Sequence, residues 1–206
     1  MPWNIRQRMA SPAPIKASPL HPNNWILAGF LRLSAEGVDA VRVEVLARDL
    51  AVSKGSFYWH FHDREDLLTK MLSRWEEDET EWLEQVTANS GSVAGRWARF
   101  VERSSNLELG RLEVAIRAWA RRDHGVAARV STIEKKKSRF IADILRDTGF
   151  ASDAAEYWSE IVLLACLGWI DCSTRDGSFQ SPNSTLGEFL SELILAASAR
   201  SAASQS

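Results

Sequence analysis

The chain has 206 residues, of which 45% are hydrophobic and 25% are charged, a balance that excludes a disordered chain. No apolar run approaches the roughly 18 residues that a membrane-spanning helix needs, so we expect a cytoplasmic protein that does not enter a membrane. The net charge of -2 excludes a uniformly basic protein, yet residues 1–60 carry seven Lys or Arg against four Asp or Glu, and a positive end of this kind is typical of a nucleic-acid partner.

Residues 1–22 are expected to form a flexible arm, because they hold five of the six prolines and show no helical period. A first helix should begin near Asn23 or Asn24 and end at Gly37. Its apolar side chains would cover the core of a three-helix module at residues 23–70; they are Trp25, Ile26, Phe30, Leu31 and Leu33.

Two short helices joined by a tight turn are predicted between residues 43 and 59. The first is marked by apolar residues at i, i+3, i+4 and i+7, namely Val43, Leu46, Ala47 and Leu50. Ser53 offers a side-chain oxygen to cap the second helix. Phe57 should be buried, because so short a helix is not stable alone.

The outer face of the second helix is rich in hydrogen-bond donors and carries no carboxylate. The donors are Lys54, Ser56, Tyr58, the indole of Trp59, and His60. We expect Tyr58 to be the better phosphate donor and Trp59 to be half-buried. This arrangement is the helix-turn-helix pattern, which lays its second helix in the major groove of double-stranded DNA.

The same stretch resembles the TetR family of one-component bacterial repressors, over about residues 24–72. The resemblance is carried by the run Ala47-x-x-Leu50-Ala51-Val52-Ser53-Lys54-Gly55-Ser56-Phe57-Tyr58-Trp59-His60-Phe61 and by Arg64-Glu65-x-Leu67-Leu68. It implies that phosphates or bases are contacted by Ser53, Lys54, Ser56, Tyr58 and His60, and that Arg64 contacts the DNA backbone. Gly55 would let the helix approach DNA closely. Where the family usually has Ser or Thr, this chain has Val41 and Arg42, and Arg42 is long enough to reach a phosphate.

A long helix is predicted from the cap at Asp63 to Asn89, before Gly91. Five more helices should follow, at residues 93–105, 108–122, 125–149, 152–174 and 185–199, the last with a capping box formed by Thr185 and Glu188. Since no alternating strand pattern occurs, the fold class is all-α. Residues 71–200 would form a helical-bundle regulatory and dimerisation domain, and residues 201–206 a flexible tail.

Aromatic residues in this second domain predict a cavity. Large rings pack imperfectly between helices, so an apolar or aromatic small-molecule effector could bind among them. The candidate lining residues are Trp75, Trp82, Trp97, Phe100, Trp119, Phe140, Trp158 and Trp169. The basic run at residues 135–137 is expected to be a solvated helix face.

A homodimer is predicted from the last two helices, because the penultimate helix is apolar around more than one face and needs two partners. The candidate interface residues are Leu163, Leu167, Ile170, Leu186, Phe189, Leu190 and Leu193. Two recognition helices about 34–36 Å apart would also suit successive major grooves.

We expect no enzymatic activity, no cofactor and no metal site. No nucleophile with a base, paired carboxylates or phosphate loop is visible, and His60 with His62 lacks further ligands. The sequence predicts a repressor that binds a pseudo-palindromic operator and is released by a ligand. Two alternatives remain open: a DNA-binding regulator or activator without a small-molecule inducer, and a helical enzyme or scaffold with an incidental helix-turn-helix resemblance.

Overall fold

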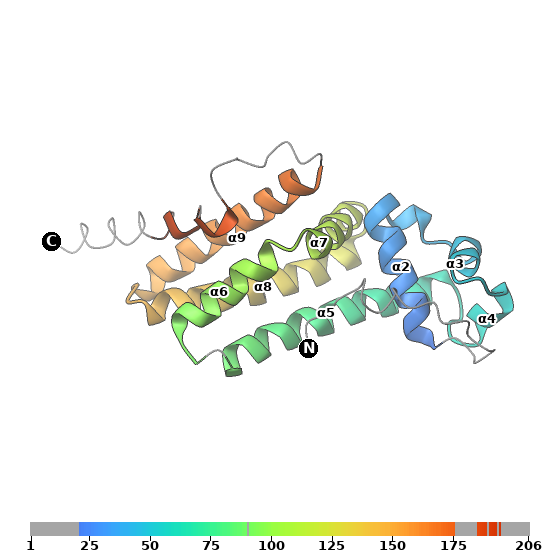
Figure 1. Ribbon diagram of the computed structural model, residues 1–206, viewed down its shortest axis with the longest axis horizontal. Helices are drawn as coiled ribbons and strands as arrows, with labels where there is room; N and C mark the ends of the chain where they lie inside the picture. The colour runs from blue at the N-terminus through green and yellow to red at the C-terminus, as the bar shows by residue number, and fades with distance from the viewer. Residues whose placement is uncertain (1–20, 90, 176–184, 189, 193, 195–206) are drawn as a thin grey trace. The chain divides into compact units, whose positions relative to one another are not determined.

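The computed structural model describes residues 21–89, 91–175, 185–188, 190–192 and 194, and every structural statement below concerns these residues. They form helices and no strand, which confirms the predicted all-α class (Figure 1). The elements are α2 (Pro22–Glu36), the 3-10 turn η1 (Val38–Ala40), α3 (Val43–Asp49), α4 (Lys54–Tyr58), α5 (Arg64–Asn89), α6 (Val93–Ser104), α7 (Leu107–Ala120), α8 (His124–Asp147) and α9 (Ser152–Arg175). None of the described helices is both long and apolar enough to span a bilayer.

The chain divides into two compact units between Ser73 and Arg74, three residues beyond the boundary expected from the sequence. Helix α5 supplies residues to both units. Helix α2 begins at Pro22, with His21 as its cap, so this helix starts one residue before the expected Asn23. The remainder of the predicted arm and the predicted tail lie outside the described residues.

The first unit is built around a small aromatic core. Trp25 of α2 meets Phe57 of α4 edge to face at 5.2 Å between ring centroids, and Phe57 stacks on Phe61 at 5.1 Å. All three rings are buried. The burial of Phe57 confirms the prediction that α4 is held by this ring rather than by its own helix propensity.

The turn between α3 and α4 is closed by the backbone. The Val52 amide donates to the Ala47 carbonyl at 2.9 Å, which satisfies an end carbonyl of α3. In this turn Ala51 adopts a φ of 54°, a left-handed conformation that costs a non-glycine residue roughly 1–2 kcal/mol. Helix α4 therefore starts within five residues of the end of α3.

The second unit is a helical bundle in which α8 packs along α9, and α7 packs against both (Figure 1). Local signals set the helix starts: Asn106 accepts from the Glu108 and Leu109 amides, and Asp123 accepts from the Gly125 and Val126 amides. The core of α8 and α9 is aliphatic and is formed by Ile133, Ile141, Leu145, Ala155, Val162 and Ile170.

Only the beginning of the last predicted helix is described. The predicted capping box is present there: the Thr185 amide donates to Glu188 Oε2 at 2.6 Å, and the Glu188 amide donates to Thr185 Oγ1 at 3.3 Å. Residues 195–199, which the sequence also assigned to this helix, lie outside the described residues.

Candidate DNA-binding surface and regulatory cavity

Helix α4 presents its donor-rich face to solvent, because Phe57 fixes the opposite face in the core. Ser53 occupies the cap position of α4, but its side chain makes no cap hydrogen bond. The expected capping role of the Ser53 hydroxyl is therefore wrong. The consequence is that this exposed hydroxyl is not used to close the helix.

Both rings at the end of α4 point outward. Tyr58 is 61% exposed and Trp59 is 87% exposed, so the prediction of a half-buried Trp59 is wrong. The physical reason is that Trp59 keeps helical backbone angles (φ -72°, ψ -20°) two residues after the buried Phe57, which turns it about 200° away from the core. Phe57 and Phe61 already fill the available core. An indole this exposed is unusual for a single chain and suits a surface with an outside partner.

Lys54 lies on the same surface but is paired with a carboxylate from α3. Its Nζ is 2.9 Å from Glu44 Oε1, and both side chains are more than half exposed. The hydrogen bond from Lys54 lowers the pKa of Glu44 below its ordinary value. An exposed pair of this kind is weak, because water screens it, so the ammonium group can exchange one anion for another.

The two arginines near the start of the motif make backbone contacts. Arg42 caps α3 by position without a side-chain cap bond, and its Nε donates to the Asp39 carbonyl at 2.9 Å. Arg64 donates from Nε to the Val41 carbonyl at 2.6 Å and from Nη2 to the Val38 carbonyl at 2.7 Å. Arg64 thus ties the start of α5 to the η1 turn, a structural role that the sequence did not predict.

His60 and Gly55 complete the predicted contact set. His60 is partly buried, and its Nε2 is enclosed without a hydrogen-bond partner among the described residues. A contact from this nitrogen to DNA therefore needs a rotation of the ring. At Gly55 an added Cβ would meet only Ser53 Oγ, at an ordinary 3.6 Å, so nothing described in this chain requires a glycine there.

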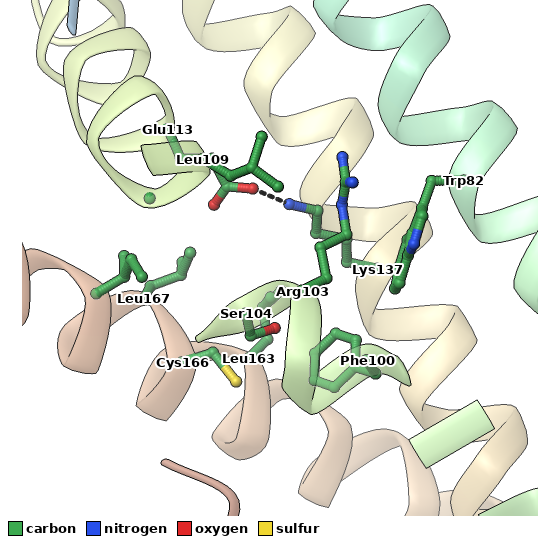
Figure 2. A pocket seen from close by; sticks show the side chains of 12 residues that line it. Trp82, Phe100, Arg103, Ser104, Leu109, Glu113, Lys137, Leu163, Cys166 and Leu167 are labelled. Carbon is green, nitrogen blue, oxygen red and sulfur yellow. Dashed lines mark hydrogen bonds and ion pairs between the residues drawn. The ribbon is translucent and has the colours of Figure 1, made fainter. Parts of the chain in front are cut away.

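The second unit contains a cavity between α5, α6, α7, α8 and α9 (Figure 2). The centre of a water-sized sphere can move through about 30 Å³ of it, and the whole depression, including the part open to solvent, encloses about 480 Å³. Its walls are formed by Trp82, Phe100, Arg103, Ser104, Leu109, Gly110, Glu113, Lys137, Leu163, Cys166, Leu167 and Ile170.

Only part of the predicted aromatic lining is found at this cavity. Trp82 and Phe100 line it, whereas six other candidates do not: Trp75, Trp97, Trp119, Phe140, Trp158 and Trp169. Of these six, Trp75, Trp119 and Phe140 are buried, and Trp97, Trp158 and Trp169 pack partly buried against the core. These six rings pack elsewhere in the bundle, and most of the cavity lining is aliphatic or charged.

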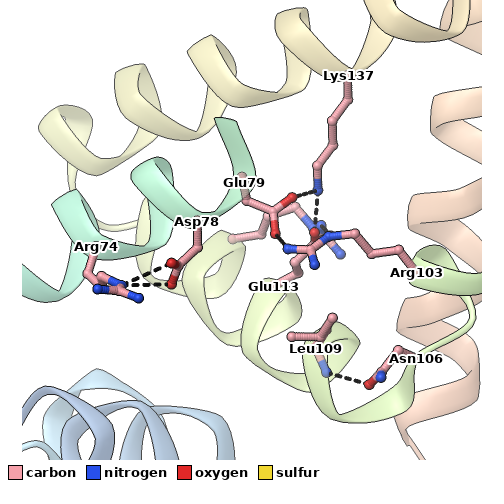
Figure 3. A network of polar contacts seen from close by, with 9 residues as sticks. Arg74, Asp78, Glu79, Arg103, Asn106, Leu109, Glu113 and Lys137 are labelled. Carbon is pink, nitrogen blue, oxygen red and sulfur yellow. Dashed lines mark hydrogen bonds and ion pairs between the residues drawn. The ribbon is translucent and has the colours of Figure 1, made fainter. Parts of the chain in front are cut away.

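A buried ionic network borders the cavity (Figure 3). Glu79 of α5 pairs with Arg103 of α6 and lies 2.9 Å from Lys137 Nζ of α8; Lys137 also pairs with Glu113 of α7, which contacts Arg117 at 3.3 Å. Four helices therefore meet through side-chain charges. Replacing one member would leave the buried charges of the others out of balance, which is destabilising.

Two opposing effects set the pKa values in the network: burial disfavours the charged form of each group, and neighbouring opposite charges favour it. Burial opposes ionisation of Glu79, but Lys137 and Arg103 outweigh it and lower the pKa of Glu79. Burial alone would also lower the pKa of Lys137, yet Glu113 and Glu79 raise it above its ordinary value. Both groups are therefore charged. By contrast, burial raises the pKa of the Cys166 thiol to about 12, so this cavity residue is neutral.

Sequence reasoning missed this network, and its expectation of a solvated face at residues 135–137 is wrong for Lys137. A signal was available: Lys137 lies four residues after Ile133 and four before Ile141, both buried, which places it on the core-facing stripe of α8. The spacing along α8 does not show that Lys137 pairs with carboxylates on two other helices, because that pairing depends on how the helices pack together.

None of the five predicted dimer residues that the structure describes has an exposed side chain. Leu163, Ile170, Leu186 and Leu190 are buried within the chain, and Leu167 lines the cavity; Phe189 and Leu193 lie outside the described residues. Instead α9 exposes Tyr157 (62%) and Leu164 (67%). These two side chains are seven residues apart and share one helical face, about 100° around the helix from Leu163.

Comparison with known proteins addresses the first unit most directly. Residues 26–71 match the family described as bacterial regulatory proteins, tetR family. This range contains α2, η1, α3 and α4 and the beginning of α5. No curated protein sequence matches the chain.

Solved structures resemble the chain over most of its length. A transcriptional regulator from Rhodococcus sp. Rha1 has a TM-score of 0.67 at 16% identity, covering 87% of this chain and 95% of that one. Two proteins assigned to the TetR family of transcriptional regulators are similar: one from Rhodococcus sp. (TM-score 0.61, 18% identity, 85% and 95% covered) and one from Mesorhizobium loti MAFF303099 (0.66, 20%, 86% and 95%). At these identities the likeness establishes a shared fold.

Proposed function

The chain belongs to the TetR family of transcriptional regulators through its N-terminal domain, and from this premise we propose that it is a repressor. In this proposal a homodimer binds a pseudo-palindromic operator through the exposed face of α4. A small molecule bound in the second unit then lowers the affinity for DNA. The observation that carries the proposal is the outward face of α4, with Lys54, Tyr58 and Trp59 all exposed.

The surface of α4 supports DNA as the partner. Its hydroxyl, ammonium and indole groups donate hydrogen bonds, which suits phosphate oxygens and base acceptors. No contact among the described residues requires a glycine at position 55. The missing side chain there would instead let an external partner approach the helix closely. We assign the contacts to Arg42, Ser53, Lys54, Gly55, Ser56, Tyr58, Trp59, His60 and Arg64.

The exposed face of α9 supports the homodimer. Leu164 and Tyr157 place two large side chains in solvent on one helix of a single chain, where a partner would bury them. A two-fold dimer presents two copies of α4, which is what a pseudo-palindromic operator requires.

Release by a ligand is supported by the position of Glu79. This carboxylate is on α5, the helix that continues to Arg64, and it pairs with two cations that line the cavity. A ligand that prefers one arrangement of these groups shifts the population toward it, by no more than its difference in affinity for the two arrangements.

The test is selection of bound fragments from genomic DNA by the purified full chain. We expect enrichment of fragments sharing a pseudo-palindrome whose half-sites lie about one helical turn or a multiple apart. The matched control is Tyr58→Ala with Trp59→Ala, which removes exposed rings and should abolish enrichment without changing the melting temperature. Failure of the unchanged chain to select any shared sequence at low salt would overturn the proposal.

A second candidate is a DNA-binding regulator without a small-molecule inducer. The observation that favours it is the narrowness of the cavity, about 30 Å³ for the centre of a water-sized sphere. In that case no small compound would raise the melting temperature of the full chain in a screen, while selection of operator fragments would still succeed.

A further inference from the structure

Charged and apolar residues line different sides of the cavity. Figure 2 shows the charged ends of Glu113, Lys137 and Arg103 gathered on one side, whereas Phe100 and Leu163 lie on another. The apolar part of the lining also includes Leu109, Leu167 and Ile170. A molecule that fills this space would need a polar head and an apolar body.

The charges on the lining are not balanced. Two cations, Arg103 and Lys137, line the cavity, but only one carboxylate, Glu113, does so. Both cations are largely withdrawn from water, with side chains 16% and 12% exposed. A cation in such a place attracts an anion far more strongly than a solvated one does, because little water screens it.

Further charges surround the lining. Three cations, Arg103, Arg117 and Lys137, pair with the carboxylates of Glu79 and Glu113, and a third carboxylate, Glu134, interacts electrostatically with Arg117 and Lys137 while burial raises its pKa. Nη2 of Arg117 is buried and has no hydrogen-bond partner among the described residues. An anionic group that entered here would find donors that these carboxylates do not saturate.

We propose that the effector is a small organic carboxylate with an aliphatic or aromatic body, whose carboxylate binds Lys137 and Arg103. This inference rests on the function proposed above and names the class of its ligand. The free space, about 30 Å³ for the centre of a water-sized sphere, is narrow, so the ligand must have a slim body, part of which would lie in the outer part of the depression that is open to solvent.

Binding of the ligand carboxylate to Arg103 and Lys137 would also affect helix α5. Arg103 and Lys137 are the two partners of Glu79, so a ligand carboxylate that binds them competes with Glu79. Release of Glu79 removes its own charged contacts with α6 and α8, whereas the pair between Glu76 of α5 and Arg129 of α8 remains. The ligand thereby favours an arrangement of the second unit in which α5 is less constrained.

The experiment titrates the full chain with 3-phenylpropanoate and octanoate, followed by calorimetry and by melting temperature. The matched probes are 3-phenylpropan-1-ol and 3-phenylpropylamine, which keep the ring and chain but replace the carboxylate. We expect the carboxylates to bind and to raise the melting temperature, and the alcohol and the amine to bind about tenfold or more weakly. Equal or tighter binding of the alcohol or the amine, or binding of neither carboxylate, would overturn the assignment.

A variant tests the sign of the charge effect without removing a cation. Glu113→Gln deletes the carboxylate that competes for Lys137, so 3-phenylpropanoate should bind about tenfold more tightly than to the unchanged chain. Leu167→Trp should fill the cavity and abolish binding. The unliganded melting temperature of each variant reports whether it folds. Weaker binding of 3-phenylpropanoate to a folded Glu113→Gln protein contradicts the proposal.

Regulation is tested separately on the selected operator. Addition of 3-phenylpropanoate at saturating concentration should release the DNA from the unchanged chain, and binding of the ligand without release would overturn its role as effector. If the chain selects no operator at all, the proposed function fails, while the calorimetric result still decides whether the cavity binds carboxylates.

Discussion

Individual side chains around α4 divide into those that hold the motif together and those that face outward. Arg64 belongs to the first group through its bonds to the Val38 and Val41 carbonyls, while Tyr58 and Trp59 belong to the second. The burial of Phe57 followed from the sequence, because a helix of five residues has no other means of support. The exposure of Trp59 was missed, although its position about 200° around the helix from the buried Phe57 turns it away from the core.

For single residues, we predict how operator binding changes when Lys54 or its ion-pair partner Glu44 is replaced. Lys54→Ala should weaken operator binding and reduce the slope of log affinity against log salt by about 0.9, the value for one phosphate contact. Glu44→Gln is the matched control: it removes the carboxylate 2.9 Å from Lys54 Nζ, so operator affinity should stay the same or rise. Filter binding at several salt concentrations measures both. An unchanged slope for Lys54→Ala would remove Lys54 from the contact surface.

At the scale of helices, the ends were predictable and the faces were less so. Asp123 and Thr185 mark helix starts by bonds within three residues of themselves, so the signal is local. The inward face of α9 was assigned wrongly, because apolar residues surround much of this helix and its partners decide which side is buried. The pairing of Lys137 with carboxylates of two other helices is likewise set by packing and not by spacing along α8.

For pairs of helices, we predict how stability changes when the close contact between α7 and α9 is filled. A Cβ at residue 110 would collide with Ile170, so Gly110→Ala should separate the two helices and destabilise the chain by about 1–3 kcal/mol. Gly168→Ala adds a methyl group on the face of α9 that carries Leu164, so both glycine variants are compared in the Leu164→Arg chain, where Gly168→Ala should be neutral or slightly stabilising, since alanine favours a helix more than glycine does. Urea denaturation followed by circular dichroism compares the two variants. Equal stability for both would show that the contact at Gly110 can relax without cost.

For the whole molecule, the main expectation concerns assembly. The structure moves the proposed dimer surface from the buried Leu163 and Ile170 to the exposed Tyr157 and Leu164. The sequence indicates that α9 is apolar on more than one face, but which of its apolar side chains stay exposed depends on how the single chain packs.

Leu164→Arg should therefore produce a folded monomer. The side chain is 67% exposed in the single chain, so the substitution costs the fold little, but it places a charge in the middle of the proposed interface. Light scattering should report half the mass of the unchanged protein, and operator affinity should fall roughly a hundredfold, because the two half-sites are no longer bound together. Leu107→Arg, an exposed leucine at the start of α7, is the control and should remain dimeric. A dimeric Leu164→Arg protein would place the interface elsewhere.

The enclosed ionic network also has an evolutionary consequence. A substitution at one of Glu79, Arg103, Glu113 or Lys137 leaves the enclosed charges of the others out of balance, so a lineage crosses that barrier more readily by changing two or more of these positions together. Among descendants of a common ancestor, these four sites should co-vary, with either the full charged set or an entirely uncharged replacement. Mixed sets, in which one cation or carboxylate survives alone, should be rare.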